Sequence, residues 1–514
     1  MARLKEYNGH YCESEYEYAF IGFLETEGWK YTSGNKLSRV TKRDVLIEDD
    51  FKKFIAVGNP DLTEDEVTQI YDTVRLVGAE SDFATLHKVY NWLVDGIQFT
   101  PKDGIARMIP LINFEKDGVK NIFRVVNQFT VEYTNNGQKE NRRPDVILFV
   151  NGMPLCIMEL KNPADVNATI YDAWEQINIR YWRDIPHLLH YCPLACISDG
   201  VKTRLGTVRT PYEHFYAWRR VNDGDAVSTL PFAETETMIK GVYSPERFLE
   251  IFRDYIYFQD SIYDSDEVEI VCRYPQFFAA RLLKKSIVDS VVTKSGRGGT
   301  YFGATGCGKT YTMAFLARQL ALRCTGISEI GSPTIILIVD REELQKQGAK
   351  LFTKSTEFLN LGEVSVVKNR TQLRQELGAR QSGGFYICTI QKFCDREDDK
   401  IGLINDRQNI ICFSDEAHRT QLEHSKKIQF SKDADANMKA MVSKPYAKVL
   451  KEAFPQATFV GFTGTPIAET YQTFGDEIDR YTMDQAVADG LTVSIKYHPR
   501  IAKVLLDNKK VKEI

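Results

Sequence analysis

Short apolar runs recur through the second half of the chain, and each is followed by a stretch with helical spacing. The runs lie at 299–302, 333–340, 385–390, 409–415 and 458–463. Strands that are apolar throughout and alternate with helices are typical of a parallel sheet covered by helices on both faces. We therefore expect a parallel α/β domain over 269–470, with ligands bound at the carboxyl ends of its strands.

The first half of the chain has a more varied pattern. It predicts an amphipathic helix over 13–27, a mostly helical stretch over 62–94, strands over 121–133 and 192–198, and a helix over 170–181. We expect these elements to form a first domain over 1–230. A connecting segment over 231–268 follows, and an acidic run at 260–269 marks its end.

The most informative stretch of the first domain is 143–161, RPDVILFVNGMPLCIMELK. Two apolar runs flank Asn-Gly, a strong hairpin signal. Asp145 opens the first strand, and Glu159 and Lys161 share one face at the end of the second. Phosphodiester cleavage uses a divalent ion, and Mg²⁺ prefers carboxylate oxygens. The pattern predicts that Asp145 and Glu159 bind Mg²⁺ while Lys161 orients the attacking water.

This metal site depends on the register of the hairpin. A strict two-residue loop would place Asp145 opposite Met158 and on the other face from Glu159. A three-residue loop or an equivalent bulge would place the two carboxylates opposite each other, with Cβ atoms about 5 Å apart. We predict the loop or the bulge. The alternative is a surface hairpin that carries ordinary charges at its ends.

The second informative stretch is 303–310, GATGCGKT, which fits the phosphate-loop pattern G-x-x-x-x-G-K-[ST] between a strand and a helix. Glycines let backbone N–H groups approach phosphate oxygens, and a helix N-terminus favours the same charge. The pattern predicts an ATP site with Mg²⁺ bound by Thr310. Its expected contacts are Gly303, Thr305, Gly306, Gly308, Lys309 and Thr310.

Two further motifs follow predicted strands of the same sheet. D-E-A-H lies at 415–418, and T-G-T-P lies at 463–466. Asp415 is expected to hold the Mg²⁺ bound by Thr310, and Glu416 to take a proton from the attacking water. The candidates for relaying the state of the phosphate are His418, Thr463 and Thr465.

Composition narrows the partners and the compartment. There are 66 Lys and Arg residues against 70 Asp and Glu, so nucleic-acid contacts must come from local patches. No apolar run approaches the roughly 18 residues of a membrane span, and no signal peptide is visible. Ten scattered cysteines indicate a reduced, cytoplasmic setting. The cluster His187, His190, Cys192 and Cys196 has metal-binding residue types but no C-x-x-C, which favours core packing.

The motif order resembles known families. G-x-x-x-x-G-K-T, D-E-A-H and T-G-T-P resemble the first motor domain of superfamily 2 helicases and translocases. The hairpin, the residues Gln176 and Tyr181, and D-E-A-H-R-T-Q at 415–421 resemble the motor and endonuclease subunit of type I restriction enzymes. The resemblance implies an α/β fold in which a RecB-like PD-(D/E)xK nuclease domain precedes a RecA-like parallel-sheet motor domain.

The resemblance also implies roles for single residues. Gln176 and Tyr181 would be the accessory nuclease residues, although four residues separate them here where the family motif has three. An acidic residue of the first helix is expected too, Glu15 or alternatively Glu17. Gln276 matches a glutamine that reads adenine.

The implied activity is ATP-dependent translocation of double-stranded DNA coupled to Mg²⁺-dependent cleavage. Methyltransferase and specificity subunits would supply recognition and S-adenosylmethionine. A complete motor needs a second RecA-like domain, and 471–514 is expected to begin it, so the chain is expected to bind ATP but hydrolyse it slowly. The alternatives are a superfamily 2 repair or RNA helicase with a non-catalytic N-terminal interaction domain, and a non-enzymatic ATP-switched scaffold.

Overall fold

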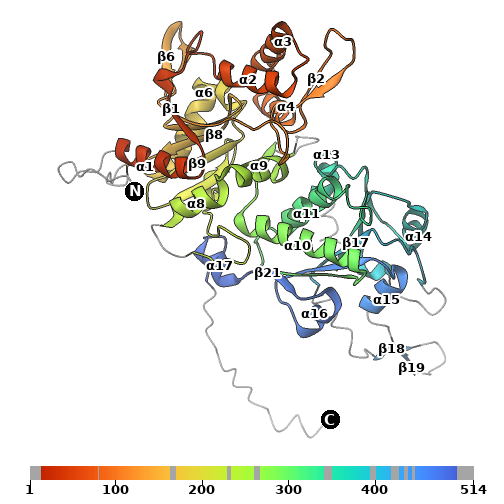
Figure 1. The fold of residues 1–514 in the computed structure, drawn as a ribbon. Coiled ribbons are helices and arrows are strands. Elements are labelled where there is room, and N and C mark those ends of the chain that lie inside the picture. The colour runs from red at the N-terminus through yellow and green to blue at the C-terminus, as the bar shows by residue number, and fades with distance from the viewer. Residues whose placement is uncertain are drawn as a thin grey trace, which may run out of the picture.

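The computed structural model describes most of the chain, in two adjoining units that each contain a central sheet (Figure 1). The described residues are 13–78, 80–162, 169–228, 233–259, 267–340, 350–393, 401–417, 428–432, 438–442 and 446–494.

A mixed six-stranded sheet forms the centre of the N-terminal unit, with strand order β1-β4-β7-β8-β9-β10. Its strands are β1 (Lys30–Ser33), β4 (Phe123–Asn127), β7 (Val146–Val150), β8 (Met153–Leu160), β9 (Leu194–Ser198) and β10 (Thr203–Thr207). Every residue of β7, β8 and β9 is buried, because helices cover both faces of the central strands. The expected hairpin and the strand after it therefore form the core of this unit.

Helices and short ladders surround that sheet. The helices before the hairpin are α1 (Glu13–Thr26), α2 (Glu48–Gly58), α3 (Glu64–Arg75) and α4 (Asp82–Asp95), and those after it are α5 (Ile170–Glu175), η2 (Gln176–Tyr181), α6 (Trp182–Asp184) and α7 (Pro186–Leu189). Small antiparallel ladders pair β2 (Ile97–Phe99) with β3 (Arg107–Ile109), and β5 (Val131–Asn135) with β6 (Gln138–Arg142). Helix α1 contacts β8 directly, as do α5 and η2, so both ends of the predicted nuclease motif meet at that strand.

The connecting segment contains two helices and a ladder. These are α8 (Glu234–Val242), α9 (Pro245–Asp254), and the antiparallel pair β11 (Ile256–Gln259) and β12 (Val268–Val271). Helix α8 contacts α1 and β10 of the N-terminal unit, and α9 contacts α11 of the second unit. The segment thus joins the two units by packing against both.

A seven-stranded sheet with only parallel pairings forms the second unit, in the order β15-β16-β14-β17-β20-β13-β21. Its strands are β13 (Arg297–Gly303), β14 (Thr334–Val339), β15 (Val364–Val366), β16 (Phe385–Thr389), β17 (Ile410–Asp415), β20 (Thr458–Thr463) and β21 (Glu477–Tyr481). The predicted parallel sheet is confirmed, and the phosphate loop follows β13, the strand next to the edge strand β21.

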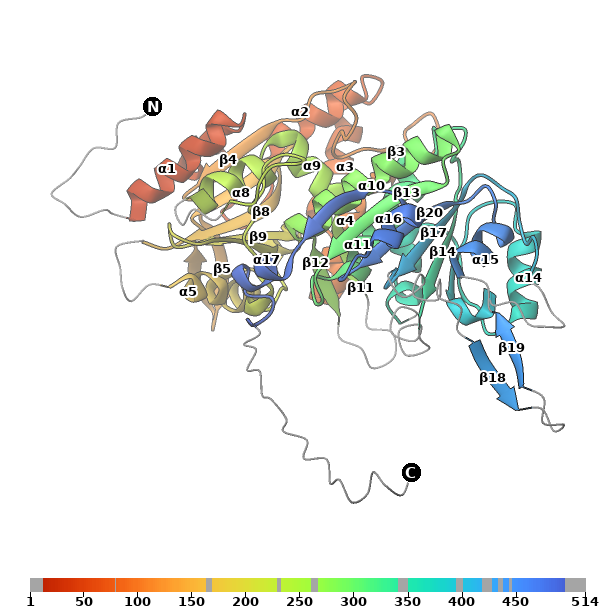
Figure 2. The ribbon, with the colours of Figure 1, turned by 90° about the horizontal axis from the view of Figure 1, so that it is seen from below.

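The helices of this unit lie on both sides of its sheet (Figure 2). They are α10 (Tyr274–Thr293), α11 (Lys309–Arg323), α13 (Thr356–Leu359), α14 (Arg370–Ala379), η5 (Ile390–Phe393), α15 (Tyr446–Ala453), α16 (Ala468–Phe474) and α17 (Met483–Ala488). A hairpin of β18 (Ile428–Lys432) and β19 (Met438–Val442) projects from the sheet (Figure 2). No helix of the described ranges is both long and apolar enough to cross a membrane.

The end of the described chain departs from expectation. Residues 471–514 were expected to begin a separate domain, with a helix and then a strand from 481 onward. β21 instead pairs in parallel with β13 and completes the same sheet, whereas the helix expected after 481 is present as α17. An edge strand with charged residues, EIDRY, lacks the apolar run that identified its neighbours, which is why the pattern missed it.

Candidate functional site

The hairpin of β7 and β8 has a two-residue turn and a bulge. Asn151 and Gly152 both adopt positive φ, 51° and 79°, as a type I′ turn requires. The register then shifts by one residue beyond the Phe149↔Pro154 pair, so that Val146 pairs with Met158. The shift brings Asp145 level with Glu159, and the predicted equivalent of a three-residue loop is confirmed. Both carboxylates now lie on one face.

Asp145 and Glu159 form the centre of the first candidate site. Asp145 Oδ2 accepts the backbone N–H of Leu160 at 2.8 Å. Glu159 is fully buried, and burial, followed by the charge of Asp145, raises the pKa of its carboxyl well above the ordinary value. Among the described residues, Oε2 of Glu159 has no hydrogen-bond donor, and Lys161 Nζ lies 3.9 Å from it. A buried carboxylate oxygen without a donor is costly, so this position suits a bound cation.

The accessory residues close a chain of hydrogen bonds around Glu159. Lys161 Nζ donates to Gln176 Oε1 at 2.9 Å, and Gln176 Nε2 donates to the Tyr181 hydroxyl at 2.7 Å. The Tyr181 hydroxyl donates to Glu159 Oε1 at 2.6 Å. Lys161 and Glu159 are therefore held by the same two side chains.

A π-helical turn explains the unusual spacing of that pair. The segment Gln176–Tyr181 is a π-helix, in which residues five apart occupy one face. Two residues with four others between them therefore share a face in a π-helix, as two residues with three others between them do in an α-helix. Tyr181, which the spacing had placed in doubt, lies in hydrogen-bond contact with both Gln176 and Glu159.

A third carboxylate approaches from α1. Glu17 is buried, and its Oε1 accepts from Asn127 Nδ2 at 2.6 Å. Burial raises the pKa of Glu17, and the charge of Asp145 adds to the rise. Asn127 pairs with Val146, the residue after Asp145, so Glu17 lies beside the start of β7. Glu15 is partly exposed and has no such contact among the described residues. The alternative choice, Glu17, is therefore the acidic residue that the structure brings to Asp145.

The second candidate site is the phosphate loop between β13 and α11. Gly306 and Gly308 both have φ of 84°, the left-handed region that favours glycine. Lys309 Nζ donates to the carbonyl of Gly303 at 3.2 Å and lies 4.0 Å from Glu416 Oε1. The lysine therefore lies over the loop, between its first glycine and the carboxylate of the next motif.

Asp415 ends β17 and Glu416 follows it; β17 lies two strands from β13. Burial raises the pKa of Asp415 to about 6, and the nearby Lys309 moderates the rise. The backbone N–H of Glu416 donates to Asp415 Oδ1 at 3.0 Å, and Glu416 has φ of 48°, a conformation uncommon outside glycine. The turn after the strand thus points two neighbouring carboxylates toward the loop region.

The T-G-T-P motif packs against the same loop. Thr463 is buried at the end of β20, and its Oγ1 accepts the N–H of Thr465 at 3.1 Å. A Cβ on Gly464 would lie 3.3 Å from the carbonyl oxygen of Gly303 and 3.6 Å from Thr305 Oγ1. Thr465 is exposed. His418 lies outside the described residues, so its relay role stays a prediction.

Gln276 contacts the loop through its side chain. Its Oε1 accepts the N–H of Arg273 at 2.9 Å, which caps α10, and its Nε2 donates to the Gly308 carbonyl at 3.3 Å. The side chain is buried. Gln276 therefore supports the loop directly, and its reading of adenine stays a prediction.

The His and Cys cluster has the character of a core. Burial lowers the pKa of His187 to about 4, and His190 Nε2 lies 2.9 Å from Asp82 Oδ1. Cys192 donates to the Pro154 carbonyl at 3.4 Å, and burial raises the pKa of the Cys196 thiol to about 12. Within the described ranges, no three His, Cys, Asp or Glu side chains are grouped as metal ligands. The two cysteines are buried, and core packing of the whole cluster stays a prediction.

Sequence models of two known families match the two units. The sequence model for "Type I restriction enzyme R protein N terminus" matches residues 11–214, and that for "SWI2/SNF2 ATPase" matches residues 275–514. A solved fragment of a putative HsdR subunit of a type I restriction enzyme from Vibrio vulnificus covers 71% of this chain and 56% of its own, at 16% identity. Its TM-score of 0.26 is too low to support an argument about the fold.

Two curated relatives extend over nearly the whole chain. The type I restriction enzyme HindI endonuclease subunit of Haemophilus influenzae is 31% identical over 94% of this chain and 46% of its own length. The putative type I restriction enzyme MjaIXP endonuclease subunit of Methanocaldococcus jannaschii is 30% identical over 96% of this chain and 46% of its own. The chain is therefore a homologue of the endonuclease subunits of type I restriction enzymes, and it spans about half the length of these relatives.

Proposed function

We propose that the chain couples ATP-dependent translocation of double-stranded DNA to Mg²⁺-dependent endonucleolytic cleavage, as the restriction subunit of a type I restriction-modification complex. One observation carries the proposal: a closed carboxylate–lysine site and a phosphate loop occur in a single chain. The partners would be double-stranded DNA and the methyltransferase and specificity subunits, with S-adenosylmethionine bound only by the methyltransferase. The compartment would be the cytoplasm.

In the N-terminal unit, 1–230, a PD-(D/E)xK nuclease of RecB type would use Asp145 and Glu159 to hold Mg²⁺. The ion would supply binding of the scissile phosphate and activation of water. Lys161 would offset charge on the phosphate and orient the attacking water. Gln176 and Tyr181 hold Lys161 and Glu159 in one geometry, which is the role that supporting hydrogen bonds play around metal ligands.

In the motor, 269–470, the N–H groups of the phosphate loop would bind ATP, with Lys309 on the outer phosphates. Thr310 and Asp415 would hold the Mg²⁺ of the nucleotide. Glu416 would accept the proton of the attacking water, since it lies beside Lys309 at the same edge of the sheet. Thr463, through the turn that packs on Gly303, would register the state of the phosphate.

The experiment is cleavage and translocation by the assembled complex carrying Asp145→Ala. We expect DNA translocation and ATP hydrolysis to continue while cleavage is lost. Lys309→Ala should stop translocation and cleavage together. Asp65→Ala is a matched control, because this aspartate is exposed in the first turn of α3 and bonds no described residue of the site. Full cleavage by the Asp145→Ala complex would overturn the nuclease assignment and favour a helicase with a non-catalytic N-terminal domain.

A further inference from the structure

Asp489, one residue after α17, accepts hydrogen bonds from three separate segments. The Tyr481 hydroxyl donates to its Oδ2 at 2.7 Å, and the Tyr274 hydroxyl donates to the same atom at 2.9 Å. Arg219 Nε forms an ion pair with Oδ1. The carboxylate is only 7% exposed, so its environment is poorly screened and each donor matters.

Two of these donors support the phosphate loop. The backbone carbonyl of Tyr481 accepts the N–H of Ala304, the second residue of the loop, at 2.8 Å. Tyr274 begins α10 two residues before Gln276, whose Nε2 bonds the Gly308 carbonyl. Asp489 thus fixes the elements that hold the loop near both of its ends.

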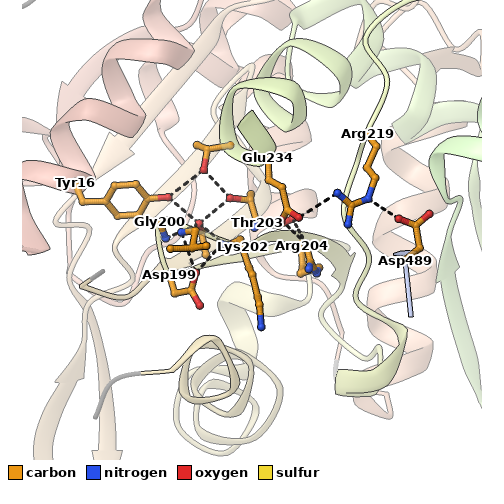
Figure 3. A network of polar contacts seen from close by, with 12 residues as sticks. Tyr16, Asp199, Gly200, Lys202, Thr203, Arg204, Arg219, Glu234 and Asp489 are labelled. Atoms are coloured by element: carbon orange, nitrogen blue, oxygen red, sulfur yellow. Dashed lines mark hydrogen bonds and ion pairs between the residues drawn. The ribbon is translucent and has the colours of Figure 1, made fainter. Parts of the chain in front are cut away.

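The third donor leads into the N-terminal unit. Arg219 Nη1 lies 3.4 Å from Glu234 Oε1, and Glu234 Oε2 accepts the N–H of Thr203 at 3.0 Å. Arg204 forms a second ion pair with Glu234. Figure 3 shows Arg219 between the two carboxylates, Glu234 on one side and Asp489 on the other.

From Thr203 the polar contacts continue to the candidate nuclease site. Thr203 Oγ1 lies 2.8 Å from Ser198 Oγ, which lies 2.7 Å from the Tyr16 hydroxyl (Figure 3). Tyr16 precedes Glu17 in α1. The carbonyl of Ser198 accepts the backbone N–H of Lys161 at 2.8 Å. The network therefore ends at Lys161 on one side and at Ala304 on the other.

We propose that Asp489 is a positioning residue through which Arg219 of the N-terminal unit sets the nucleotide affinity of the phosphate loop. The inference rests on the proposed ATP binding. Arg219 satisfies both carboxylates only when α17 and α8 are held together. If the contact between Arg219 and Asp489 orders the phosphate loop, it raises the affinity of the loop for nucleotide. By reciprocity, bound nucleotide must then strengthen that contact by the same factor. The residue is distant from the reacting atoms and acts through Tyr481 and Tyr274.

The test is the affinity of the whole chain for a fluorescent ATP analogue with Mg²⁺. Arg219→Gln and Asp489→Asn should each weaken binding about fivefold to tenfold. Tyr481→Phe keeps the ring and the backbone carbonyl, and should weaken binding about threefold to fivefold by removing one hydroxyl. Arg220→Gln is the control for a generally weakened interface, since Arg220 pairs with Asp479 of β21 at 2.9 Å and donates to neither Asp489 nor Glu234. It should change the affinity less than twofold.

A double variant separates positioning from general loss of stability. If Arg219 acts through Asp489, the pair Arg219→Gln with Asp489→Asn should bind no more weakly than Asp489→Asn alone. Amide hydrogen exchange gives a second readout. Nucleotide should slow exchange over 194–207 in the unaltered chain and not in Asp489→Asn.

The outcomes that overturn the proposal are distinct from those that overturn the function. Nucleotide binding that Lys309→Ala abolishes but Arg219→Gln and Asp489→Asn leave unchanged would overturn the coupling alone. An equal loss in Arg220→Gln would do the same, because it would show only a weakened interface. An unaltered chain that binds no nucleotide would overturn both.

Discussion

Glu159 is fully buried and Asp415 is partly buried; both are carboxylates at the ends of central strands with a lysine nearby, yet their surroundings differ. Around Glu159 the contacts are made by side chains, those of Tyr181, Gln176 and Lys161. The site served by Asp415 is enclosed by backbone, with glycine at 303, 306 and 308 and a lysine bonded to a carbonyl. One site is built by side chains from distant segments, and the other by the path of one loop.

This difference determines which changes each site can tolerate. A site enclosed by backbone depends on φ values and on space next to Cα, so small residues are essential and a single added methyl group is harmful. A site enclosed by side chains depends on hydroxyl and amide groups, so a change that keeps the shape but removes one polar atom is harmful. Substitutions of matched size can therefore distinguish the two designs.

The largest effect on folding stability is expected at Gly308 in the phosphate loop. Alanine there would adopt φ of 84° and its Cβ would collide with Gln276 Nε2. We expect a loss of about 1–3 kcal/mol in the free energy of unfolding, from left-handed strain and the displaced glutamine. Nucleotide affinity should fall about tenfold, measured by titration with a fluorescent analogue.

Gly306→Ala is the matched comparison, because Gly306 has the same φ but no atom within 4 Å of the added Cβ. Gly306→Ala should have the same backbone strain without the collision, so it should lose less unfolding free energy and less nucleotide affinity than Gly308→Ala. Gly326→Ala, at a position with open space and no positive φ, should be neutral in both measurements. Equal behaviour of Gly306→Ala and Gly308→Ala would show that the Gln276 contact contributes nothing to the loop.

The fold of the second unit was largely predictable because its central strands are apolar throughout. Each run of the sequence pattern became a strand of the parallel sheet, with β14 and β20 buried at every position. The edge strand β21 was not predicted, because a strand with one exposed side needs no continuous apolar run. Its role beside β13 also depends on contacts between segments far apart in sequence, which no local pattern contains.

The two candidate sites were predictable to different degrees, because one is contiguous in sequence and the other is built from distant segments. The phosphate loop is contiguous, so its residues and order were all in one motif. The hairpin left its register open, because a bulge between Pro154 and Cys156 decides which face Asp145 takes. The choice between Glu15 and Glu17 depended on which side of α1 meets Asn127, and Asp489 had no motif at all.

The second prediction tests the site built by side chains. Tyr181→Phe keeps the ring in the core but removes the hydroxyl that joins Gln176 to Glu159. We expect DNA cleavage by the assembled complex to fall about 10–100-fold, the usual cost of losing a group that supports metal ligands. Translocation and ATP hydrolysis should not change.

Tyr171→Phe is the control for that substitution, because Tyr171 is 47% exposed on the neighbouring helix α5 and bonds nothing at the site. Cleavage within twofold of the unaltered complex in both variants would refute a role for the Tyr181 hydroxyl. It would also mean that Glu159 is positioned by Asp145 and Lys161 alone.

The smallest effect concerns acid stability, and it is confined to the N-terminal unit. Burial lowers the pKa of His187 to about 4 in the folded chain, against about 6.5 when unfolded. The folded state thus binds fewer protons between these values, and stability should fall as the pH drops from about 6.5 to about 4. We expect a contribution of about 1–2 kcal/mol after allowing for partial exposure. His187→Phe should reduce the slope of unfolding free energy against pH in that window, measured by denaturant titration. An unchanged slope would mean that burial does not lower the pKa of His187 in the folded chain.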